Sequence, residues 1–591
     1  MKLFEGHSFH IPVLGVGYSI DTPIQVAPYG ISSVISLVDD TTIEKMREFY
    51  SHKFDIPFRK ITKEVEDFRA KRITSYLNLV DEIVKRKFAE LKSSAVHAGE
   101  EIEKYVNMLP DSSTIKEKFN LSKISREAAD DFSKWVNEKL HVGSIDVNIM
   151  TKLDKVNYKN GEELPAEHND AHAALRGFAN SNLNSSLVLS AGMSPRLYSY
   201  IENFKDFFPD NYGILKKKII LKVSDFRSAF VQGKIFAAKG LWVSEYRIES
   251  GVNCGGHCFP TQGILFGPIL EEFRKNKQSL FDTCIELYKS ALQKKEIIQP
   301  AETPEIKITA QGGVGTAEEH NFLLNHFELD SVGWATPFML VPEVISIDSE
   351  TIRILADAKE DDLVYSGLSP LGVPFNTVKG VSMSVHKMEL AKNGKAGYHC
   401  TKGFLKYNTE YTEKPICTSS RQYQTIKLKE LEEQNLPQEE YIKAYERIVE
   451  KECLCNGLST STLLSKNIEV KPNFKVTCCP GPNLAYFSKI STLKEMVDHI
   501  YGRINLLDNR HRPHMFLKEL NMYFDIFNER LDNFMNNQED SKELKQLQSF
   551  QQNLMDGISY YQTLFAEKKK EVVADLEQLI NKYPAFRDFK V

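Results

Sequence analysis

Residues 305–316 read Glu-Ile-Lys-Ile-Thr-Ala-Gln-Gly-Gly-Val-Gly-Thr, and this stretch decides the fold. A short β-prone run reaches Ala310, three glycines follow almost at once, and a helical pattern begins near Ala317. A strand that passes through a glycine turn into a helix is the building block of parallel sheets. We therefore expect further units of the same kind along the chain.

Seven more short runs rich in Val, Ile and Leu occur in the first 340 residues, mostly alternating with helical patterns. Several are continuously apolar, as expected for strands that are covered on both faces. Eight parallel strands that close on themselves form a (β/α)8 barrel, and an open doubly wound sheet is the alternative; the count of eight favours the barrel. The expected strands are Val13–Gly17, Ser32–Leu37, Ser144–Met150, Ser186–Ala191, Lys218–Val223, Leu241–Tyr246, Glu305–Ala310 and Ser331–Ala335.

Helical segments interrupt and extend this pattern. After the second strand the chain is rich in Lys and Glu and helically periodic, for example at Val65, Ile73 and Leu77. A further helix over about 125–140 leads into the third strand, and a polar loop over 154–165 follows it. The predicted organisation is an α/β TIM barrel in residues 1–39 and 110–341, a helical insertion in 40–109, an irregular cysteine-containing cap in 342–495 and a C-terminal helical extension in 496–591.

The composition of the chain limits the classes of protein to which it can belong. Its 591 residues are 42% hydrophobic and 26% charged, ordinary values for a globular protein. The net charge of −5 gives no electrostatic reason to expect a nucleic-acid partner. No apolar run is long enough to span a membrane, and residues 1–7 lack the apolar core of a secretory signal. With nine cysteines, an odd number, we expect a reducing, cytoplasmic location.

Two consecutive strand ends have the residues of a phosphate site. Gly312 and Gly313 follow the seventh strand, and Gly333-Trp334-Ala335-Thr336-Pro337 ends the eighth. Glycines allow a phosphate to approach the backbone, and the N-terminus of the following helix offers N–H groups and a favourable dipole. Tight βα connections are the alternative explanation. Phosphate sites of barrels lie typically after strands seven and eight, which favours phosphate binding.

A histidine follows the sixth strand. Residues 249–258, Glu-Ser-Gly-Val-Asn-Cys-Gly-Gly-His-Cys, place His257 after Gly255 and Gly256. Most single loop histidines face solvent and do nothing specific. His257, however, is expected at the carboxyl end of a barrel strand, where a group that exchanges protons near neutral pH is suited to catalysis. We therefore predict a catalytic role.

These motifs, taken in order, resemble the nitronate monooxygenase family of FMN-binding barrels, which extends to flavin-dependent enoyl reductases. The resemblance covers roughly residues 8–490 apart from the insertion. It is carried by Val13–Tyr18 with Thr22-Pro23, Asp146–Met150, Gly255-Gly256-His257, Gln311-Gly312-Gly313, Gly333–Thr336, Cys453–Leu458 and Pro480–Leu484.

The resemblance implies roles for individual residues. His257 would handle the substrate proton or orient the substrate, and Asn148 would lie beside the flavin ring or ribityl chain. Lys222 would face the electron-rich pyrimidine side of the ring and stabilise the anionic reduced flavin; a surface lysine at the end of a strand is an equal alternative. FMN phosphate would contact Gly255, Gly256, Gly312, Gly313, Ala335 and Thr336, and the flavin-facing loop would contain Gly15, Val16 and Gly17.

Several features depart from the family pattern. Asn253-Cys254 precedes the Gly-Gly-His segment and Cys258 follows it, which leaves the substrate open. The insertion and the tail resemble the larger enoyl reductases of polyketide and polyunsaturated-fatty-acid synthases. The sequence therefore predicts an FMN-dependent oxidoreductase of the nitronate monooxygenase type that acts on a small-molecule or acyl substrate with O2 as acceptor. The alternatives are an enoyl reductase that uses NAD(P)H and a non-catalytic FMN-binding scaffold with a helical tail that recruits partners; the C-terminal helices could also join copies of the chain.

Four cysteines beyond the barrel, Cys400, Cys417, Cys453 and Cys455, have the ligand type of a zinc or iron–sulfur site. Their spacing is irregular, and Cys-Leu-Cys is not the usual Cys-x2-Cys pair. Buried free cysteines are common. We expect no metal site, although an iron–sulfur cluster that passes electrons to a flavin is the interesting alternative.

Overall fold

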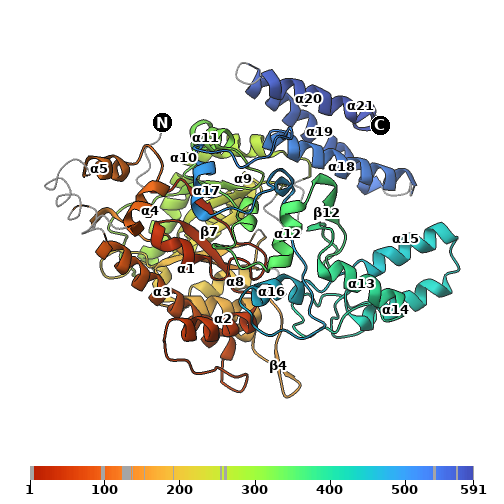
Figure 1. Ribbon diagram of the computed structural model, residues 1–591, viewed down its shortest axis with the longest axis horizontal. Coiled ribbons are helices and arrows are strands. Elements are labelled where there is room, and N and C mark those ends of the chain that lie inside the picture. Colours follow the sequence, from red (N-terminus) through yellow and green to blue (C-terminus); the bar gives the residue numbers. More distant parts are fainter. Residues whose placement is uncertain are drawn as a thin grey trace.

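The computed structural model describes residues 6–94, 100–122, 135, 138–151, 154–190, 192–252, 256–257, 262–536, 541–566 and 570–589. Its centre is a closed barrel of eight parallel strands in the order β1-β11-β10-β8-β7-β6-β3-β2 (Figure 1). This confirms the predicted TIM-barrel fold. The strands are β1 Phe9–Ile11, β2 Ser32–Ser36, β3 Ile145–Ile149, β6 Ser185–Leu189, β7 Lys217–Val223, β8 Val243–Glu249, β10 Lys307–Gln311 and β11 Ser331–Gly333.

The first strand differs from its prediction. We expected Val13–Gly17, but the strand is Phe9–Ile11, and the Val-Leu-Gly-Val-Gly stretch forms a turn. Gly15 has a positive φ of 54°, and the Ile20 amide donates to the Gly17 carbonyl at 3.0 Å. Pro12 follows the strand and has no N–H to donate to a neighbouring strand. The β8 strand also extends three residues beyond its predicted end at Tyr246.

Side chains alternate along each strand between the barrel interior and the surrounding helices. Val34, Val188 and Ile220 form a small apolar cluster of their own, with Val13 packed against it. The large core that surrounds the barrel contains their neighbours Ile35, Leu187 and Leu221. Side chains two residues apart on a strand point the same way. On each strand of the small cluster, the side chain two residues further along therefore points into the carboxyl end of the barrel, which we call the mouth.

Most of the helical layer is built as predicted. The insertion between β2 and β3 consists of α2 Asp40–Lys53, α3 Phe68–Ser94, α4 Glu100–Met108 and α5 Thr114–Ser122. In α3 the apolar positions Ile73, Leu77 and Val80 are fully buried, whereas Val65 lies exposed before the helix. The helix expected over 125–140 falls largely outside the described residues. The other barrel helices are α7 Asp170–Ala179, α8 Pro195–Ile201, α9 Phe226–Ala238, α10 Phe266–Lys294 and α11 Ala317–His326.

Residues 342–495 contain more regular structure than the irregular cap we expected. Two strands, β12 Leu363–Ser366 and β13 Phe375–Val378, form a small antiparallel sheet with β9 Gly256–His257. The helices α14 Arg421–Glu433 and α15 Gln438–Val449 project away from the barrel (Figure 1). The other helices here are α12 Ser349–Asp357, α13 Ser382–Lys392 and α16 Leu454–Ser465. The polar loop predicted after β3 contains the exposed hairpin β4 Tyr158–Lys159 and β5 Glu162–Glu163.

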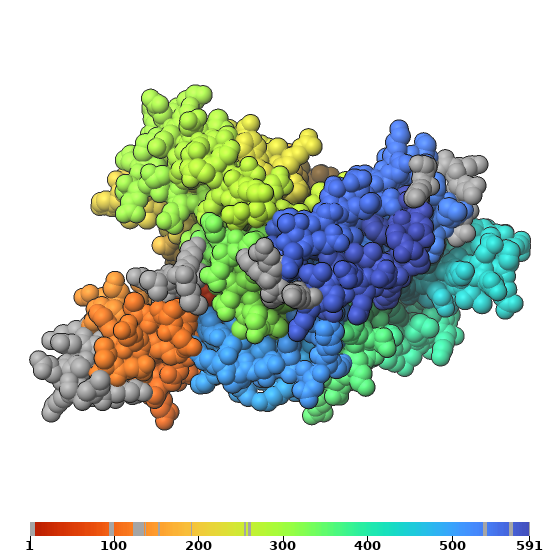
Figure 2. Space-filling model, turned by 90° about the horizontal axis from the view of Figure 1, so that it is seen from above, coloured from red at the N-terminus to blue at the C-terminus, as the bar shows by residue number. Residues whose placement is uncertain are grey.

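The C-terminal region is helical, as predicted. It consists of α17 Leu493–Ile500, α18 Met515–Asn536, α19 Ser541–Phe565, α20 Lys570–Lys582 and α21 Pro584–Asp588. The dark blue block of Figure 2 shows these last helices lying against the yellow-green part of the barrel. Among the residues that the structure describes, no helix is long and apolar enough to cross a membrane.

Candidate active site at the barrel mouth

Polar side chains from several strands meet at the mouth. Lys222 of β7 donates to Glu249 Oε1 of β8 at 3.2 Å, and Gln311 Nε2 of β10 donates to the same oxygen at 2.7 Å. The Lys222 and Glu249 side chains are each only 12% exposed. A largely shielded cation and a carboxylate on neighbouring strand ends are typical of barrel active sites, because catalytic groups there come from different strands. Lys222 is therefore not a surface lysine.

Two buried oxygen atoms at the mouth have no hydrogen-bond partner within the described part of the chain. They are Oδ1 of Asn148, on β3, and Oε1 of Gln311. Asn148 is 3% exposed and Gln311 is 2% exposed. An unpaired buried acceptor costs free energy on the order of 1–3 kcal/mol. These two atoms are therefore ready to accept hydrogen bonds from a bound polar molecule.

His257 lies on β9, which pairs with β13 through Phe375 and Asn376. Its Nε2 hydrogen-bonds to Ser369 Oγ at 2.6 Å, and its ring packs edge-on against Phe375 at 5.1 Å between ring centroids. The ring is half-buried. The cap sheet therefore orients this histidine. Gly256 precedes it with a φ of 77°, while Gly255 and its neighbours Asn253, Cys254 and Cys258 lie outside the described residues.

The glycine turn after β10 is held from outside the barrel. Gly312 and Gly313 have φ values of 104° and 85°. The Gly313 carbonyl accepts hydrogen bonds from Asn483 Nδ2 at 2.6 Å and from Arg512 Nη2 at 2.8 Å. Arg512 also pairs with Glu319 at 2.7 Å, and both side chains are buried. The turn therefore has one fixed conformation.

The N-terminus of α11 differs from its sequence-based interpretation. We expected free N–H groups there, but Gly315 N donates to Glu319 Oε2 at 2.9 Å and Glu319 N donates to Thr316 Oγ1 at 3.1 Å. Burial alone would raise the pKa of Glu319, but the Arg512 guanidinium outweighs it and lowers that pKa. An ionised carboxylate therefore already occupies the position at the helix end where a phosphate was expected.

The loop after β8 is anchored at both ends by one residue of the C-terminal extension. Glu519, on α18, accepts hydrogen bonds from Gly251 N at 2.7 Å, Ser250 Oγ at 3.1 Å and Phe266 N at 2.7 Å. His257 lies in the chain between these attachment points. Burial raises the pKa of Glu519 to about 7, although the Phe266, Gly251 and Ser250 hydrogen bonds oppose the shift.

The remaining predicted residues also lie near the mouth. Ala335 and Thr336 follow β11, and they are buried beside the β10 turn because Gln311 pairs with Gly333. Gly15, Val16 and Gly17 form the turn after β1. A Cβ on Gly17 would lie 2.5 Å from Thr462 Oγ1 of α16, so this glycine is needed for the close approach of the two segments.

Sequence reasoning missed several residues of the site. Glu249 and Gln311 lie in segments that the sequence singled out, but neither residue was assigned a role. Each follows an interior residue of its own strand by two positions, so strand alternation alone could have placed its side chain inside the barrel. Ser369, Glu519 and Arg512 lie more than a hundred residues from the groups they contact. No local pattern marks such residues.

A second polar cavity, of about 880 Å³, opens where the strands begin. Asp146, Glu245 and Arg247 line it. Arg247 pairs with Glu245 at 2.7 Å, and Asp146 accepts hydrogen bonds from Ser144 Oγ and Ser186 N. Because this end of such barrels usually serves stability, we assign function to the mouth.

The four cysteines considered as metal ligands gather in the cap. Cys400, Cys453 and Cys455 are close enough to influence one another electrostatically, and Cys417 Sγ hydrogen-bonds to Ser419 Oγ at 3.2 Å. Nevertheless, the described residues include no group of three or more His, Cys, Asp or Glu side chains arranged to hold a metal ion.

Fold and site together define a (β/α)8-barrel protein with a polar mouth that a helical C-terminal region holds in place. No protein-family model and no curated protein matches the sequence. Among solved structures, it is similar to the enoyl reductase domain of MlnA, from the macrolactin biosynthesis cluster of Bacillus amyloliquefaciens, at 15% identity and a TM-score of 0.28. The match covers 69% of this chain and 87% of that one. A likeness of this size does not bear on the chemistry of the site.

Proposed function

We propose that the chain is an FMN-dependent oxidoreductase whose active site is the barrel mouth. The observation that carries the proposal is the pair of unpaired buried acceptors at the mouth, Asn148 Oδ1 and Gln311 Oε1, together with Lys222, whose side chain is 12% exposed. A flavin has an N–H group and ribityl hydroxyls that satisfy such acceptors, and its reduced form gains from a nearby cation. When bound, FMN supplies hydride transfer to or from a substrate carbon.

Each part of the mouth has a task in this proposal. Lys222 offers a positive charge, and Glu249 and Gln311 fix its position. The phosphate would rest on the backbone N–H groups of Gly312 and Gly313, with Ala335, Thr336, Gly255 and Gly256 around it, since Glu319 already serves the α11 N-terminus. The turn of Gly15, Val16 and Gly17 would border the ring.

His257 would move the proton. Ser369 and Phe375 fix the orientation of its ring, and an imidazole held in this way would exchange a proton with a bound substrate. In the nitronate monooxygenase version, His257 takes a proton from, or orients, a substrate with an acidic carbon, and O2 is the final acceptor. In the enoyl reductase version, NAD(P)H is the electron donor and the histidine orients or protonates an activated C=C bond.

The first test is the visible absorption spectrum of the purified protein, followed by titration of the apoprotein with FMN. Flavin bands, or saturable uptake of FMN, are the expected result. A colourless preparation that takes up no FMN contradicts the proposal. Anaerobic addition of NADPH then separates the two versions, because rapid flavin bleaching indicates the reductase, and bleaching only by a nitronate indicates the monooxygenase.

The second test uses His257→Ala with His511→Ala as its matched control, because the His511 side chain is 75% exposed and lies outside the mouth. We expect His257→Ala to bind FMN normally and to lose turnover by about 10²–10⁴-fold, the usual contribution of a general acid or base. The control should keep full turnover. Full turnover in His257→Ala would assign catalysis to a different residue.

A third test concerns Lys222. Lys222→Met should make the midpoint potential of the bound flavin more negative, because it removes the cation that stabilises the reduced anion. Lys218→Met is the control, since Lys218 lies at the opposite end of the same strand and lines the other cavity. Equal potentials in the two variants would remove the assigned role of Lys222.

A further inference from the structure

The cavity where the strands begin has no part in the proposed catalysis, although it is built from the interior of the same barrel. On β7, Lys218 lines this cavity, Ile220 belongs to the small apolar cluster, and Lys222 lies at the mouth. Side chains two positions apart on a strand point the same way, so these three follow one another along the barrel interior. The apolar cluster therefore separates the cavity from the mouth.

The interior of the barrel is polar at this end. Bulky branched side chains fill the interior layers of most (β/α)8 barrels. Here six polar residues on five strands occupy interior positions and line the cavity, namely Ser32, Asp146, Ser186, Glu245, Arg247 and Thr309. Apolar side chains of similar volume often stabilise a protein more than a buried ion pair does. Stability alone therefore does not explain this layer.

Hydrogen bonds within the layer use only part of each charged group. Arg247 Nε and Nη2 contact Glu245 Oε1 at 2.8 and 2.7 Å, and Thr309 Oγ1 donates to the same oxygen. Asp146 accepts two hydrogen bonds, both at Oδ1. Within the described part of the chain, Asp146 Oδ2, Glu245 Oε2 and Arg247 Nη1 make no hydrogen bond. These three atoms remain available to a ligand.

His10 adds a fourth unpartnered group to the wall of the cavity. It is 4% exposed; its Nδ1 hydrogen-bonds to Ser331 Oγ at 2.9 Å, and its Nε2 has no partner among the described residues. Burial, together with the positive charge of Arg247, lowers the pKa of His10 well below its usual range, so the ring is neutral. One nitrogen of a neutral imidazole donates and the other accepts. A hydroxyl group can pair with Nε2 in either state.

The charges around the cavity favour a neutral ligand. Arg247 stands among Asp146 and Glu245 in the deep layer. The rim has two exposed lysines and two exposed glutamates, Lys218, Lys307, Glu302 and Glu305. Guanidinium groups only donate hydrogen bonds and carboxylates only accept them, whereas a hydroxyl does both. A molecule with several hydroxyl groups therefore complements this mixture better than a simple anion or cation.

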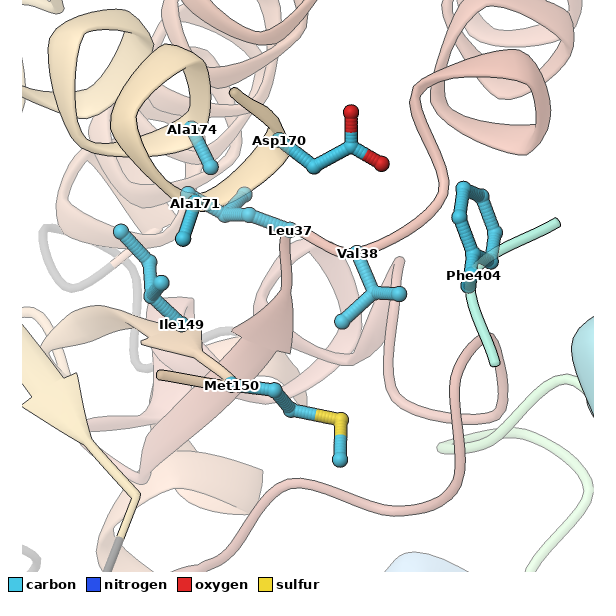
Figure 3. Close-up of a pocket in the computed structure, with 8 residues that line it drawn as sticks. All are labelled: Leu37, Val38, Ile149, Met150, Asp170, Ala171, Ala174 and Phe404. Atoms are coloured by element: carbon cyan, nitrogen blue, oxygen red, sulfur yellow. The ribbon is translucent and has the colours of Figure 1, made fainter. Parts of the chain in front are cut away.

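The two ends of the barrel are covered differently. At the carboxyl ends of β2 and β3, Phe404 of the cap lines a small pocket with Val38 and Met150 (Figure 3). At the opposite end, two loops border the cavity, and the Ala301 amide of one donates to the Gly213 carbonyl of the other at 3.2 Å.

Tyr212, beside Gly213, lines the cavity and is 80% exposed. The face of an aromatic ring is electron-rich, so it attracts the C–H groups of a sugar ring. An exposed tyrosine beside a polar cavity is therefore suited to cover a bound sugar.

We propose that this cavity binds a neutral, polyhydroxylated small molecule, a sugar or cyclic polyol of one or two rings. Its hydroxyl groups hydrogen-bond to Asp146, Glu245, Arg247 and His10, and Tyr212 covers the ring from the rim. The volume of about 880 Å³ falls within the range of about 300–1,000 Å³ that is usual for small-molecule pockets. The ligand enters from the end of the barrel opposite the mouth.

The experiment is saturation-transfer NMR followed by isothermal titration calorimetry on the full-length protein. D-Glucose, D-ribose, myo-inositol and maltose are the neutral ligands tested, and inorganic phosphate and putrescine represent a simple anion and a simple cation. We expect saturable binding of at least one neutral ligand, tighter than that of phosphate or putrescine. Absence of saturable binding by all four neutral ligands, or tighter binding of either ion, overturns the proposal.

Two variants and a matched control locate the binding site. Asp146→Asn should weaken the affinity about tenfold, because hydrogen bonds to a charged group are roughly twice as strong as neutral ones. Tyr212→Ala should weaken it about 3–10-fold, and folding is unaffected because this side chain is exposed. Tyr158→Ala is the control, since Tyr158 is 49% exposed and lies on β4, after β3. Equal affinities in Tyr212→Ala and Tyr158→Ala overturn the proposal.

The binding measurements require no flavin, so they are independent of the proposed activity. A bound sugar should leave the affinity of the protein for FMN unchanged, because the apolar cluster separates the two sites. Competition between the sugar and FMN would place the sugar at the mouth and overturn the assignment to this cavity.

Discussion

The two glycine-bearing loops of the mouth, after β8 and after β10, are each held by a buried glutamate, but the two glutamates are in different electrostatic situations. Glu319 serves the β10 turn and is paired with Arg512 at 2.7 Å. Glu519 serves the β8 loop through three hydrogen bonds from neutral donors. The pKa of Glu319 is lowered, chiefly by Arg512 against burial, whereas burial raises the pKa of Glu519 to about 7.

The anchor of the β10 turn therefore contributes a nearly constant stability over ordinary pH values, whereas the contribution of the β8 anchor depends on pH. An acid whose pKa is lowered on folding stabilises the fold above its unfolded pKa and loses that contribution in acid. An acid whose pKa is raised on folding stabilises the fold at low pH and loses that contribution as the pH rises through the folded value. The loop that bears His257 therefore has the pH-sensitive anchor.

The largest expected effect comes from breaking the Glu319 pair. Arg512→Met should lower the free energy of unfolding by about 3–5 kcal/mol, because it leaves a buried carboxylate without its cation. Urea denaturation measures the change. Arg510→Met is the control; Arg510 pairs with Asp508 but is 42% exposed, so its loss should cost less than about 1 kcal/mol. Equal costs for the two variants would refute the distinction between the loops.

The second prediction concerns pH. Folding raises the Glu519 pKa from 4.5 to about 7, so the stability that this residue contributes should fall by about 3 kcal/mol between pH 4.5 and pH 8, at 1.36 kcal/mol per unit. Glu519→Gln should remove this decline. His7 and His320 are buried, and their pKa values are lowered to about 4 and about 3, so their contribution to stability falls as the pH drops. This contribution is the same in the unsubstituted protein and in Glu519→Gln, and it cancels when the two are compared at each pH. If the free energies of unfolding of the unsubstituted protein and of Glu519→Gln change in parallel with pH, Glu519 is ionised at neutral pH and the prediction is wrong.

The third prediction concerns the anchor itself. Glu519→Ala leaves the buried amides of Gly251 and Phe266 without their acceptor, which should cost about 2 kcal/mol. Hydrogen exchange at these two amides should accelerate, while exchange at Gly315, in the β10 turn, should stay slow. Glu529→Ala is the matched control because Glu529 lies exposed on the same helix. Unchanged exchange in Glu519→Ala would show that other contacts of the extension hold the loop.

The smallest effect is expected from backbone strain, which the two loops share. Gly313 and Gly256 have φ values of 85° and 77°, and a Cβ on either would meet no atom closer than 3.5 Å. Alanine at either position should therefore cost about 1–2 kcal/mol through conformation alone. Gly6→Ala, in open space, should be neutral. A much larger loss at one of the two glycines would point to a contact that the geometry does not contain.

Much of the fold could be predicted because it depends on local patterns. Alternation of strands and helices gave seven of the eight strands close to their observed bounds, and the glycine turns fixed which ends form the mouth. The first strand was wrong because Phe9–Ile11 is only three residues long, while the following Val-Leu-Gly-Val-Gly stretch has a strand-like composition. What distinguishes the two is pairing: His10 lies between Ser32 and Gly333 of neighbouring strands.

The amino-acid sequence by itself determined the barrel and the place of Asn148, Lys222 and His257 around its mouth, because strand periodicity and turn residues act over a few positions. How the mouth is held depends instead on contacts between distant parts of the chain. Glu519 and Arg512 contact loops roughly two hundred or more positions away in the chain, and Glu249 gains its partners only when neighbouring strands come into register. Burial and partner choice set the charge of these groups, and both arise only when distant segments pack together.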